Sequence, residues 1–265
     1  MKKLLLSTSG LFALALSSSA FAADLSAPVY KGAPMIPAIY DWSGFYVGIN
    51  GGGAWSNNCW TNSNLLGTPT VPTVAEGCHN ASGGMVGGQI GFRWQAANWV
   101  FGVEAEGDWA NLKGSNASLA SGFVGIPFSN QTNVDAIGLF TGQVGYAWDR
   151  VLWYVKGGAA LTNDKYNGFS TAFTGTNVAF DQGNETTRWG GAVGTGLEIS
   201  FAPNWSVAVE YDHLFMGTRD VTFTALAPSG LPVGSLVRTD SIKQDVDMAT
   251  VRLNYRWGGP VIAKY

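Results

Sequence analysis

Carboxylates occupy every second position in one stretch of this 265-residue chain, where Glu104, Glu106 and Asp108 form what we term the acidic row. Glu210 and Asp212 repeat the spacing further along. Such groups can perform general acid–base catalysis, form a path for cations, or make buried ion pairs. Five basic residues in comparable apolar segments could supply the cationic partners: Arg93, Lys156, Arg188, Arg252 and Arg256.

The segments that carry these charges alternate between apolar or aromatic residues and small or polar ones. Residues 45–50 show this alternation, and so do residues 251–257. A period of two places the two sets on opposite faces of a β-strand. The apolar face is continuous, whereas the other face is rich in glycine and balanced in charge. This combination is typical of a transmembrane β-barrel with lipid outside.

Eight segments of this kind are predicted as strands: Gly44–Ser56, Gly83–Gln95, Trp99–Asn111, Asn133–Trp148, Val151–Leu161, Arg188–Phe201, Trp205–Met216 and Val246–Trp257. Tight turns alternate with long polar connections, which are Asn57–Ser82, Leu112–Thr132, Thr162–Thr187 and Gly217–Asp245. Short periplasmic turns and long extracellular loops are typical of bacterial outer-membrane barrels. The sequence therefore predicts an all-β fold, an eight-stranded antiparallel transmembrane barrel over residues 44–265.

The N-terminus has the features of an export signal. Lys2 and Lys3 precede an apolar run, Leu4–Leu16, and an Ala-x-Ala site ends at Ala22. The run is too short for a membrane-spanning helix, which needs about 20 residues. We expect residues 1–22 to be a cleaved signal peptide and residues 23–43, which are rich in proline, to be an extended periplasmic segment. The expected location is the outer membrane of a Gram-negative bacterium.

Tryptophans gather at the ends of the predicted strands. Amphipathic rings favour the lipid–water interface, so two aromatic girdles explain this distribution better than a soluble core does. The predicted girdle residues are Trp55, Trp94, Trp99, Trp109, Trp148, Trp153, Trp189, Trp205 and Trp257.

Sequence parity places nearly all mid-strand charges on the inward face. A Lys or Arg side chain facing lipid would cost about 2–4 kcal/mol at the bilayer midplane. Eight strands enclose a bore that side chains can just fill. The acidic row and Glu210 are the expected partners of four cations: Arg93, Lys156, Arg252 and Arg256. Arg188 and Glu198 are expected in the same interior network, which makes a plug; a narrow, gated channel is the alternative.

The two cysteines, Cys59 and Cys78, both fall in the first predicted long connection. In an oxidising compartment this spacing predicts a disulfide. The alternative is a metal or haem ligand at Cys78 and His79, which lack further ligand residues nearby. We therefore expect no metal and no cofactor.

His213 follows Asp212 near the outer end of a predicted strand, and some outer-membrane barrels are hydrolases that use His with Asp. Adjacent residues point to opposite faces of an ideal strand, so these two cannot form a dyad without a bulge. A lone interfacial histidine is the simpler interpretation.

Motifs at both ends of the chain resemble those of a known family. They are Ala23-Asp24-Leu25, Tyr30-Lys31, Trp42-Ser43-Gly44-Phe45-Tyr46-Val47-Gly48, and Arg252-Leu253-Asn254-Tyr255-Arg256-Trp257-Gly258-Gly259-Pro260, with Tyr265 at the end. Together they are similar to the small outer-membrane immunogenic, porin-family β-barrel proteins of alphaproteobacteria. The resemblance implies an abundant, surface-exposed antigen with a role in envelope integrity or in passage of small solutes. Some relatives are described as haem-binding, but no loop motif here carries that property over.

These observations predict a structural, surface-exposed and antigenic envelope protein with a charge-plugged interior and no catalytic activity. A small-solute or ion channel is the second hypothesis, and a lipid-acting hydrolase is the third. Expected partners are outer-membrane lipid, lipopolysaccharide and the barrel-assembly machinery, for which Tyr255 and Trp257 resemble the terminal-strand signal. Contacts with the cell wall or a host are further hypotheses. The formal net charge of −3 argues against a nucleic-acid partner.

Overall fold

A computed structural model describes residues 40–184 and 186–257 of the chain, so the predicted signal peptide and most of the predicted periplasmic segment lie outside the described residues. The described chain is mostly β-strand. Its elements are β1 (Gly44–Leu65), β2 (Thr68–Ala96), β3 (Trp99–Ala117), α1 (Ser121–Val124), β4 (Ser129–Trp148), β5 (Val151–Ser170), β6 (Val178–Gly183), β7 (Thr186–Ala202), β8 (Trp205–Ala225), the short 3-10 helix η1 (Ala227–Ser229) and β9 (Leu236–Trp257).

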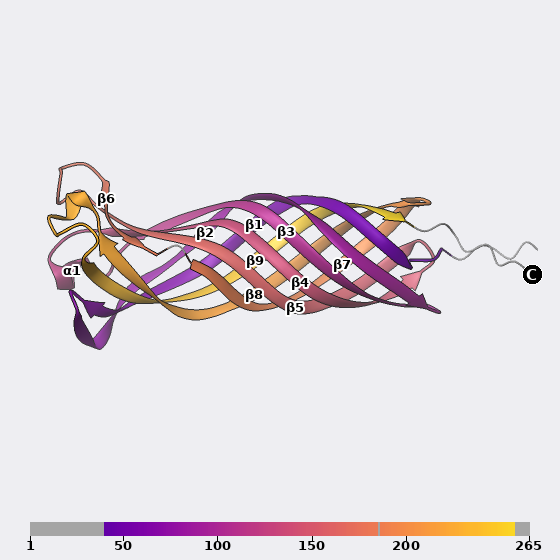
Figure 1. Cartoon of the computed structure of the whole chain (residues 1–265), viewed down its shortest axis with the longest axis horizontal. Coiled ribbons are helices and arrows are strands. Elements are labelled where there is room, and N and C mark those ends of the chain that lie inside the picture. The colour runs from indigo at the N-terminus through magenta and orange to yellow at the C-terminus, as the bar shows by residue number, and fades with distance from the viewer. Residues whose placement is uncertain (1–39, 185, 258–265) are drawn as a thin grey trace, which may run out of the picture. The chain divides into compact units, whose positions relative to one another are not determined.

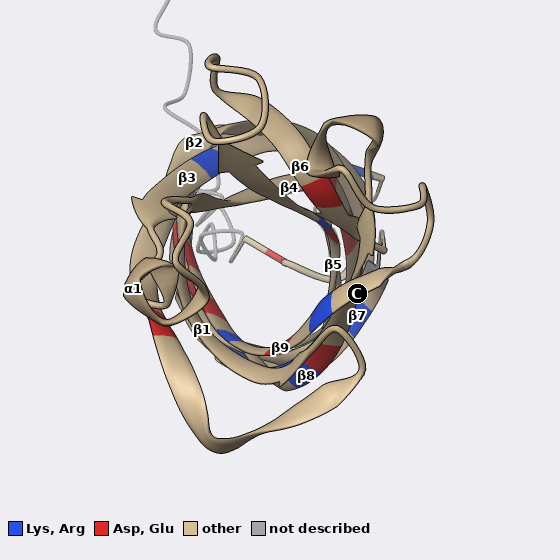
Figure 2. Ribbon diagram, turned by 90° about the vertical axis from the view of Figure 1, so that its left-hand side faces the viewer, with Lys and Arg blue, Asp and Glu red and all other residues tan. Residues whose placement is uncertain are grey.

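The strands close into an antiparallel barrel (Figure 1). Strand β9 pairs with β1, which leaves no open edge. Strands β6 and β7 both pair with β5 and with β8, so these two segments share one position in the ring. Nine strand segments therefore occupy eight positions around the barrel. Figure 2 shows the ring end on. The predicted fold class is confirmed.

Three two-residue turns connect neighbouring strands at one end of the barrel. They follow Ala96, Trp148 and Ala202, where the sequence predicted tight turns. Ala97 and Asp149 adopt positive φ angles of 55° and 53°. Two-residue hairpins favour such angles, because they match the twist of the paired strands.

The strands at the opposite end are longer than predicted. The segment 57–82, predicted as a long connection, is mostly strand and turns only at Leu66–Gly67. Strands β4, β5, β8 and β9 likewise extend into the other predicted connections. Apolar alternation identified strands only where their outer face meets lipid. Beyond that band the outer face meets water, so polar residues occur on both faces and the sequence pattern disappears.

The outer surface carries the apolar residues, as expected for a barrel in lipid. All nine predicted girdle tryptophans are at least 41% exposed. Two other tryptophans, Trp42 and Trp60, are each only 1% exposed and lie inside. None of the helices in residues 40–184 and 186–257 has the length and apolar character needed to cross a membrane.

Residues 40–43, predicted to belong to an extended tail, instead close the short-turn end of the barrel. The Trp42 indole donates to the Asp149 carbonyl at 2.9 Å, and its backbone N–H donates to Gln95 Oε1 at 2.7 Å. Tyr40 and Trp42 pack into an apolar cluster with Leu152 and Tyr154. This cluster shields the interior from the short-turn end.

Candidate functional site: the charged interior

Arg252 on β9 lies at the centre of the interior charges. Its guanidinium donates to Glu104 at 2.9 Å, lies 2.8 Å from Glu210, and also donates to Glu106. These four side chains are at most 2% exposed. A charge-assisted contact of this kind is about twice as strong as a neutral hydrogen bond, and its strength rises further away from water.

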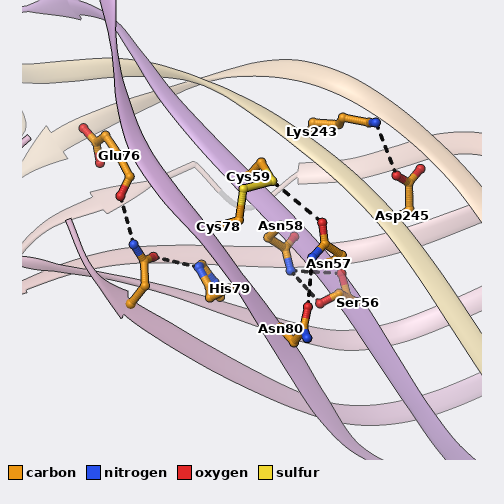
Figure 3. Close-up of a disulfide and its surroundings, with 11 residues drawn as sticks. Ser56, Asn57, Asn58, Cys59, Glu76, Cys78, His79, Asn80, Lys243 and Asp245 are labelled. Carbon is orange, nitrogen blue, oxygen red and sulfur yellow. Dashed lines mark hydrogen bonds and ion pairs between the residues drawn. A yellow bond between two sulfur atoms is a disulfide. The ribbon is translucent and has the colours of Figure 1, made fainter. Parts of the chain in front are cut away.

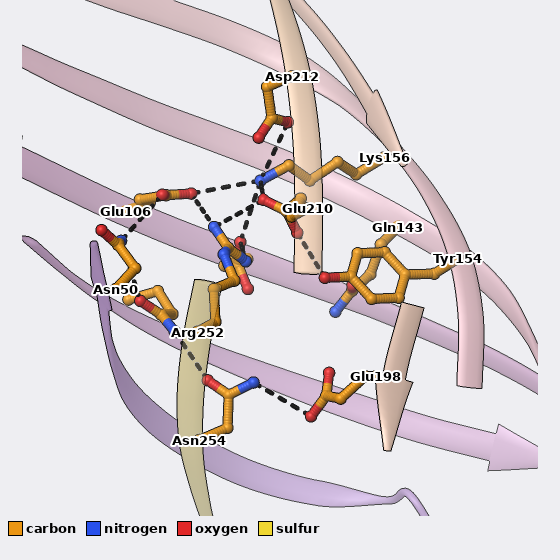
Figure 4. A network of polar contacts seen from close by, with 12 residues as sticks. Asn50, Glu106, Gln143, Tyr154, Lys156, Glu198, Glu210, Asp212, Arg252 and Asn254 are labelled. Atoms are coloured by element: carbon orange, nitrogen blue, oxygen red, sulfur yellow. Dashed lines mark hydrogen bonds and ion pairs between the residues drawn. The ribbon is translucent and has the colours of Figure 1, made fainter. Parts of the chain in front are cut away.

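Lys156 on β5 joins the same group from the other side. Its ammonium lies 3.4 Å from Glu104, 3.3 Å from Glu106, 2.5 Å from Glu210 and 3.3 Å from Asp212. We term six side chains the central layer (Figure 4): Lys156, Arg252, Glu104, Glu106, Glu210 and Asp212. Two cations thus share four buried carboxylates.

The central layer spans the full width of the lumen. Strands β3 and β8 occupy opposite positions in the eight-position ring. Glu104 and Glu106 project from β3, Glu210 projects from β8, and both Arg252 and Lys156 contact the two sides. Because the side chains meet across the diameter, the open ring of ribbons in Figure 2 is filled at this level.

Two tyrosines extend the central layer. The Tyr46 hydroxyl donates to Glu104, and the Tyr154 hydroxyl donates to Glu210, each at 2.5 Å. A Cβ atom at Gly91 would collide with the Tyr46 ring, and one at Gly196 would collide with the Tyr154 ring. Glycine at these two positions therefore lets the rings cross the lumen and reach the carboxylates.

The predicted pairing of Arg93 is wrong. Arg93 contacts Glu198 at 2.8 Å and makes no ion pair with the acidic row in the described structure. It lies one layer closer to the short-turn end, with its guanidinium 4.4 Å from the centre of the Tyr46 ring. That ring separates Arg93 from the acidic row and offers a cation–π contact in its place.

The predicted pairing of Arg256 is also wrong. Its guanidinium donates to the backbone carbonyls of Ser43 and Pro203 and lies 4.8 Å from the Tyr40 ring centre. Residues 40–43 enter the barrel at this level, and their carbonyl and ring satisfy the cation. Arg256 therefore helps to hold the N-terminal closure.

Two further predicted residues are buried but lie at the edge of the network. Arg188 is 3.6 Å from Asp164 and donates to the Ile242 carbonyl at 3.1 Å. Asp108 is 4% exposed, yet neither of its carboxylate oxygens has a hydrogen-bond partner in the described structure. The acidic row is therefore only partly neutralised.

A second charged cluster, near the loop end, was not predicted. Arg238 on β9 lies 2.7 Å from Glu76, 2.9 Å from Asp181 and 3.1 Å from Asp240, and we term these four residues the upper cluster. Burial raises the pKa of Asp240 to about 7 and also raises the pKa of Asp181, against the lowering effect of Arg238. The cluster lies in segments predicted as loops, where no inward parity was assigned.

The interior has an acidic excess. Among the described residues, ten Asp or Glu side chains and six Lys or Arg side chains are buried. The sequence indicated near neutrality, because it counted only the strands within the lipid band. This excess of carboxylates makes the electrostatic potential of the lumen negative, which favours cations over anions there.

Carboxylate oxygens of Glu104, Glu106 and Glu210 lie within 4.8 Å of one another, a spacing that could hold a metal ion. Arg252 contacts all three, and Lys156 contacts all three as well. The positive charge that a metal would supply is therefore provided by the chain itself.

Cys59 and Cys78 form a disulfide, as the sequence predicted, between directly opposed positions of β1 and β2 (Figure 3). It lies on paired strands rather than in a loop. The ring nitrogens of His79 contact Asn116 at 2.8 Å and Thr132 at 2.9 Å, and burial lowers the pKa of His79. The alternative of a Cys78–His79 ligand pair is wrong, because the sulfur is in a disulfide and the imidazole faces inward.

His213 and Asp212 point to opposite faces of β8, as alternation predicts. Asp212 points inward to Lys156, whereas His213 Nδ1 lies 2.7 Å from Asp247 on the outer face. The Tyr211 hydroxyl donates to the same carboxylate. Sequence reasoning missed Asp247, because it is a carboxylate on the outer face at the girdle, opposite both His213 and Trp55. No Ser, Thr or Cys contacts the His213 ring among the described contacts.

The chain was also compared with known proteins. A family model described as the outer membrane protein beta-barrel domain matches residues 9–256. The chain belongs to this outer-membrane β-barrel family. Its place is therefore the outer membrane of a Gram-negative bacterium.

Two outer-membrane proteins of Brucella are similar to the chain. The 31 kDa outer-membrane immunogenic proteins of Brucella melitensis and Brucella suis are each 29% identical to the chain over 211 residues, covering 77% of this chain and 84% of theirs. The resemblance inferred from the terminal motifs is thereby confirmed. Among solved structures, the outer membrane protein OprG from Pseudomonas aeruginosa has a TM-score of 0.50 at 15% identity, covering 81% of this chain and 97% of OprG. That likeness concerns the fold alone.

Proposed function

We propose that this barrel is a structural, surface-exposed protein of the outer membrane whose interior does not conduct solutes. The central layer carries the proposal, because Arg252 and Lys156 join carboxylates on opposite strands of the ring. A solute that passes must separate these buried pairs. Removing one partner from a buried ion pair costs about 3–5 kcal/mol.

The relatives support an antigenic role. The Brucella proteins are named as immunogenic outer-membrane proteins. In this chain Trp55 on β1 and its partner Asp247 on β9 lie at the girdle nearer the loop end. Both strands continue about ten residues beyond this pair, so the loop end projects from the lipid. A projecting, disulfide-linked hairpin is a suitable surface for recognition by antibodies.

Surface exposure can be tested with single cysteines in intact cells. Val233 is exposed at the loop end, and Arg150 is exposed at a short turn. We expect Val233→Cys to react with a membrane-impermeant maleimide on whole cells and Arg150→Cys to react only after lysis. The reverse pattern would contradict the proposed orientation.

The envelope role is tested by deletion and complementation. We expect the deletion strain to become sensitive to detergent and to release periplasmic protein, and the wild-type chain to restore both properties. A deletion that leaves detergent resistance unchanged but slows uptake of a small cation would instead favour a channel.

A cation channel is the second candidate, and the acidic excess of the interior favours it. Ten buried acids against six buried bases would concentrate cations in any continuous water path. The structural hypothesis requires the ion pairs of the central layer to stay formed in the resting protein, whereas the channel hypothesis requires them to separate.

A further inference from the structure

An apolar cavity of about 490 Å³ lies at the loop end of the barrel. Its wall is formed mainly by large apolar side chains, among them Leu65, Phe123, Phe128, Phe173, Phe180 and Val237. They come from the β1–β2 hairpin, from α1 and the chain that follows it, from the segment around β6, and from β9. Figure 2 views the barrel from this end. The volume is within the range of about 300–1,000 Å³ that is usual for small-molecule sites.

A buried apolar cluster adjoins the cavity through Arg238, which lines the cavity and lies 5.6 Å from the centre of the Trp60 ring. The cluster includes Trp60, Tyr166, Phe223 and Ile242, all at most 1% exposed. The Arg238 guanidinium lies 4.3 Å from the Phe223 ring centre and closes the floor of the cavity. A molecule that enters from outside is therefore held rather than passed inward.

The rim of the cavity exposes apolar side chains to water. Leu66 is 59% exposed and Phe123 is 61% exposed, and both line the cavity. Helix α1, which carries Phe123, has no buried residue. Covering such surface stabilises by roughly 25 cal/mol per Å², so an apolar occupant would remove a cost that the empty site carries.

The polar floor selects against anions. Glu76 and Arg238 line the cavity, and Asp181 and Asp240 lie behind them. The Arg238 Nη1 group already donates to Glu76 at 2.7 Å and to Asn130 at 3.0 Å, and its Nε donates to Asp181. Its Nη2 group also lies 3.5 Å from Asp181, so every nitrogen of the guanidinium already contacts an acceptor, and three carboxylates surround this one cation. An added negative charge would therefore be repelled, and a positive one attracted.

We propose that this cavity binds a small aromatic molecule from the cell exterior, with preference for a cationic amine over a neutral group and for a neutral group over a carboxylate. The aromatic lining provides ring contacts in a space that excludes water. The carboxylates of the upper cluster supply the charge preference. No His, Met, Cys or Tyr is among the described lining residues, so haem ligation is not part of this proposal.

The test uses the mature protein refolded in lipid nanodiscs with methyl-labelled Leu and Val. Three probes share one ring system and differ in charge: 2-naphthylmethylamine, 2-naphthylmethanol and 2-naphthoate. We expect saturable shifts of the Leu65 and Val237 methyl resonances, with a dissociation constant for the amine roughly tenfold or more below that for naphthoate. Lipid-facing Val251 reports partition of the probe into the bilayer.

A matched pair of variants locates the site. Val124→Trp places an indole in the cavity wall and should abolish the saturable shifts, whereas Val233→Trp adds the same group to an exposed residue outside the lining and should preserve them. Glu76→Gln should narrow the difference between amine and naphthoate.

Three results would overturn the proposal: shifts at Val251 that match those at Val237 in concentration dependence, tightest binding of naphthoate, or unchanged binding by folded Val124→Trp protein. The ranking of the three probes needs no variant, so it decides the matter even if Val124→Trp does not fold.

Discussion

Replacing Arg252 by Met should destabilise the barrel strongly. The side chain is 1% exposed and its guanidinium contacts Glu104, Glu106 and Glu210. Methionine keeps an unbranched stem of similar length, so the change removes mainly the charge. Lys156 is then the one cation left in the central layer against four carboxylates. We expect a loss of about 3–5 kcal/mol in the free energy of unfolding.

The matched control is Lys165→Met. Lys165 lies 2.7 Å from Asp135, but both side chains are about 40% exposed. Exposed ion pairs contribute about 0–1 kcal/mol, so this variant should lose no more than that. The assay is urea-dependent unfolding in lipid vesicles, followed by the difference in gel migration between folded and unfolded barrel. Glu106→Gln introduced together with Arg252→Met should restore part of the loss, because it removes one unpaired carboxylate.

Equal destabilisation by Arg252→Met and Lys165→Met would refute this reasoning. A stable Arg252→Met barrel would mean that the carboxylates are solvated by water, and that the lumen is wet at the central layer.

Three further outcomes are expected. Burial raises the pKa of Asp240 to about 7, so the folded protein binds this proton more tightly than the unfolded chain does, and the free energy of unfolding falls as the pH rises from about 4 to 7. Asp240→Asn should therefore stabilise the protein more at pH 8 than at pH 5, as measured by urea unfolding. An equal effect of the substitution at both pH values would count against this reasoning. His213→Ala should leave lipid A unchanged by mass spectrometry of membranes, and any change would revive the hydrolase hypothesis. Replacing Cys59 and Cys78 by Ser should speed proteolysis of the β1–β2 hairpin while the membrane-embedded strands stay protected, and equal protease resistance would show that strand pairing alone holds the hairpin.

The sequence predicted the fold because lipid imposes a simple rule on the strands. Within the lipid band the outer face must be apolar, so residues 45–55 and 251–257 show clear alternation and the inward charges can be assigned by parity. All ten residues proposed as interior charges are buried in the structure. Parity states which face a residue occupies, and this was enough to place them inside.

Parity does not give the position along the barrel axis at which an inward side chain meets its partner. Arg93 and Glu198 pair across the lumen because strand tilt brings them to one level, and the entry of residues 40–43 determines the partners of Arg256. The upper cluster was missed for a different reason. Above the lipid band both faces of β1, β2 and β9 are polar, so nothing in the local pattern distinguishes Arg238 from an exposed loop arginine.

The most direct test of the non-conducting interior is single-channel conductance of the refolded mature protein in planar bilayers. It should be recorded beside a variant with both Glu104→Gln and Glu106→Gln. We expect no stable conductance steps from verified, folded wild-type barrel, because the central layer joins β3 to β8 across the lumen. Stable steps with a cation preference that falls in the double variant would contradict this account and establish a cation path along the acidic row.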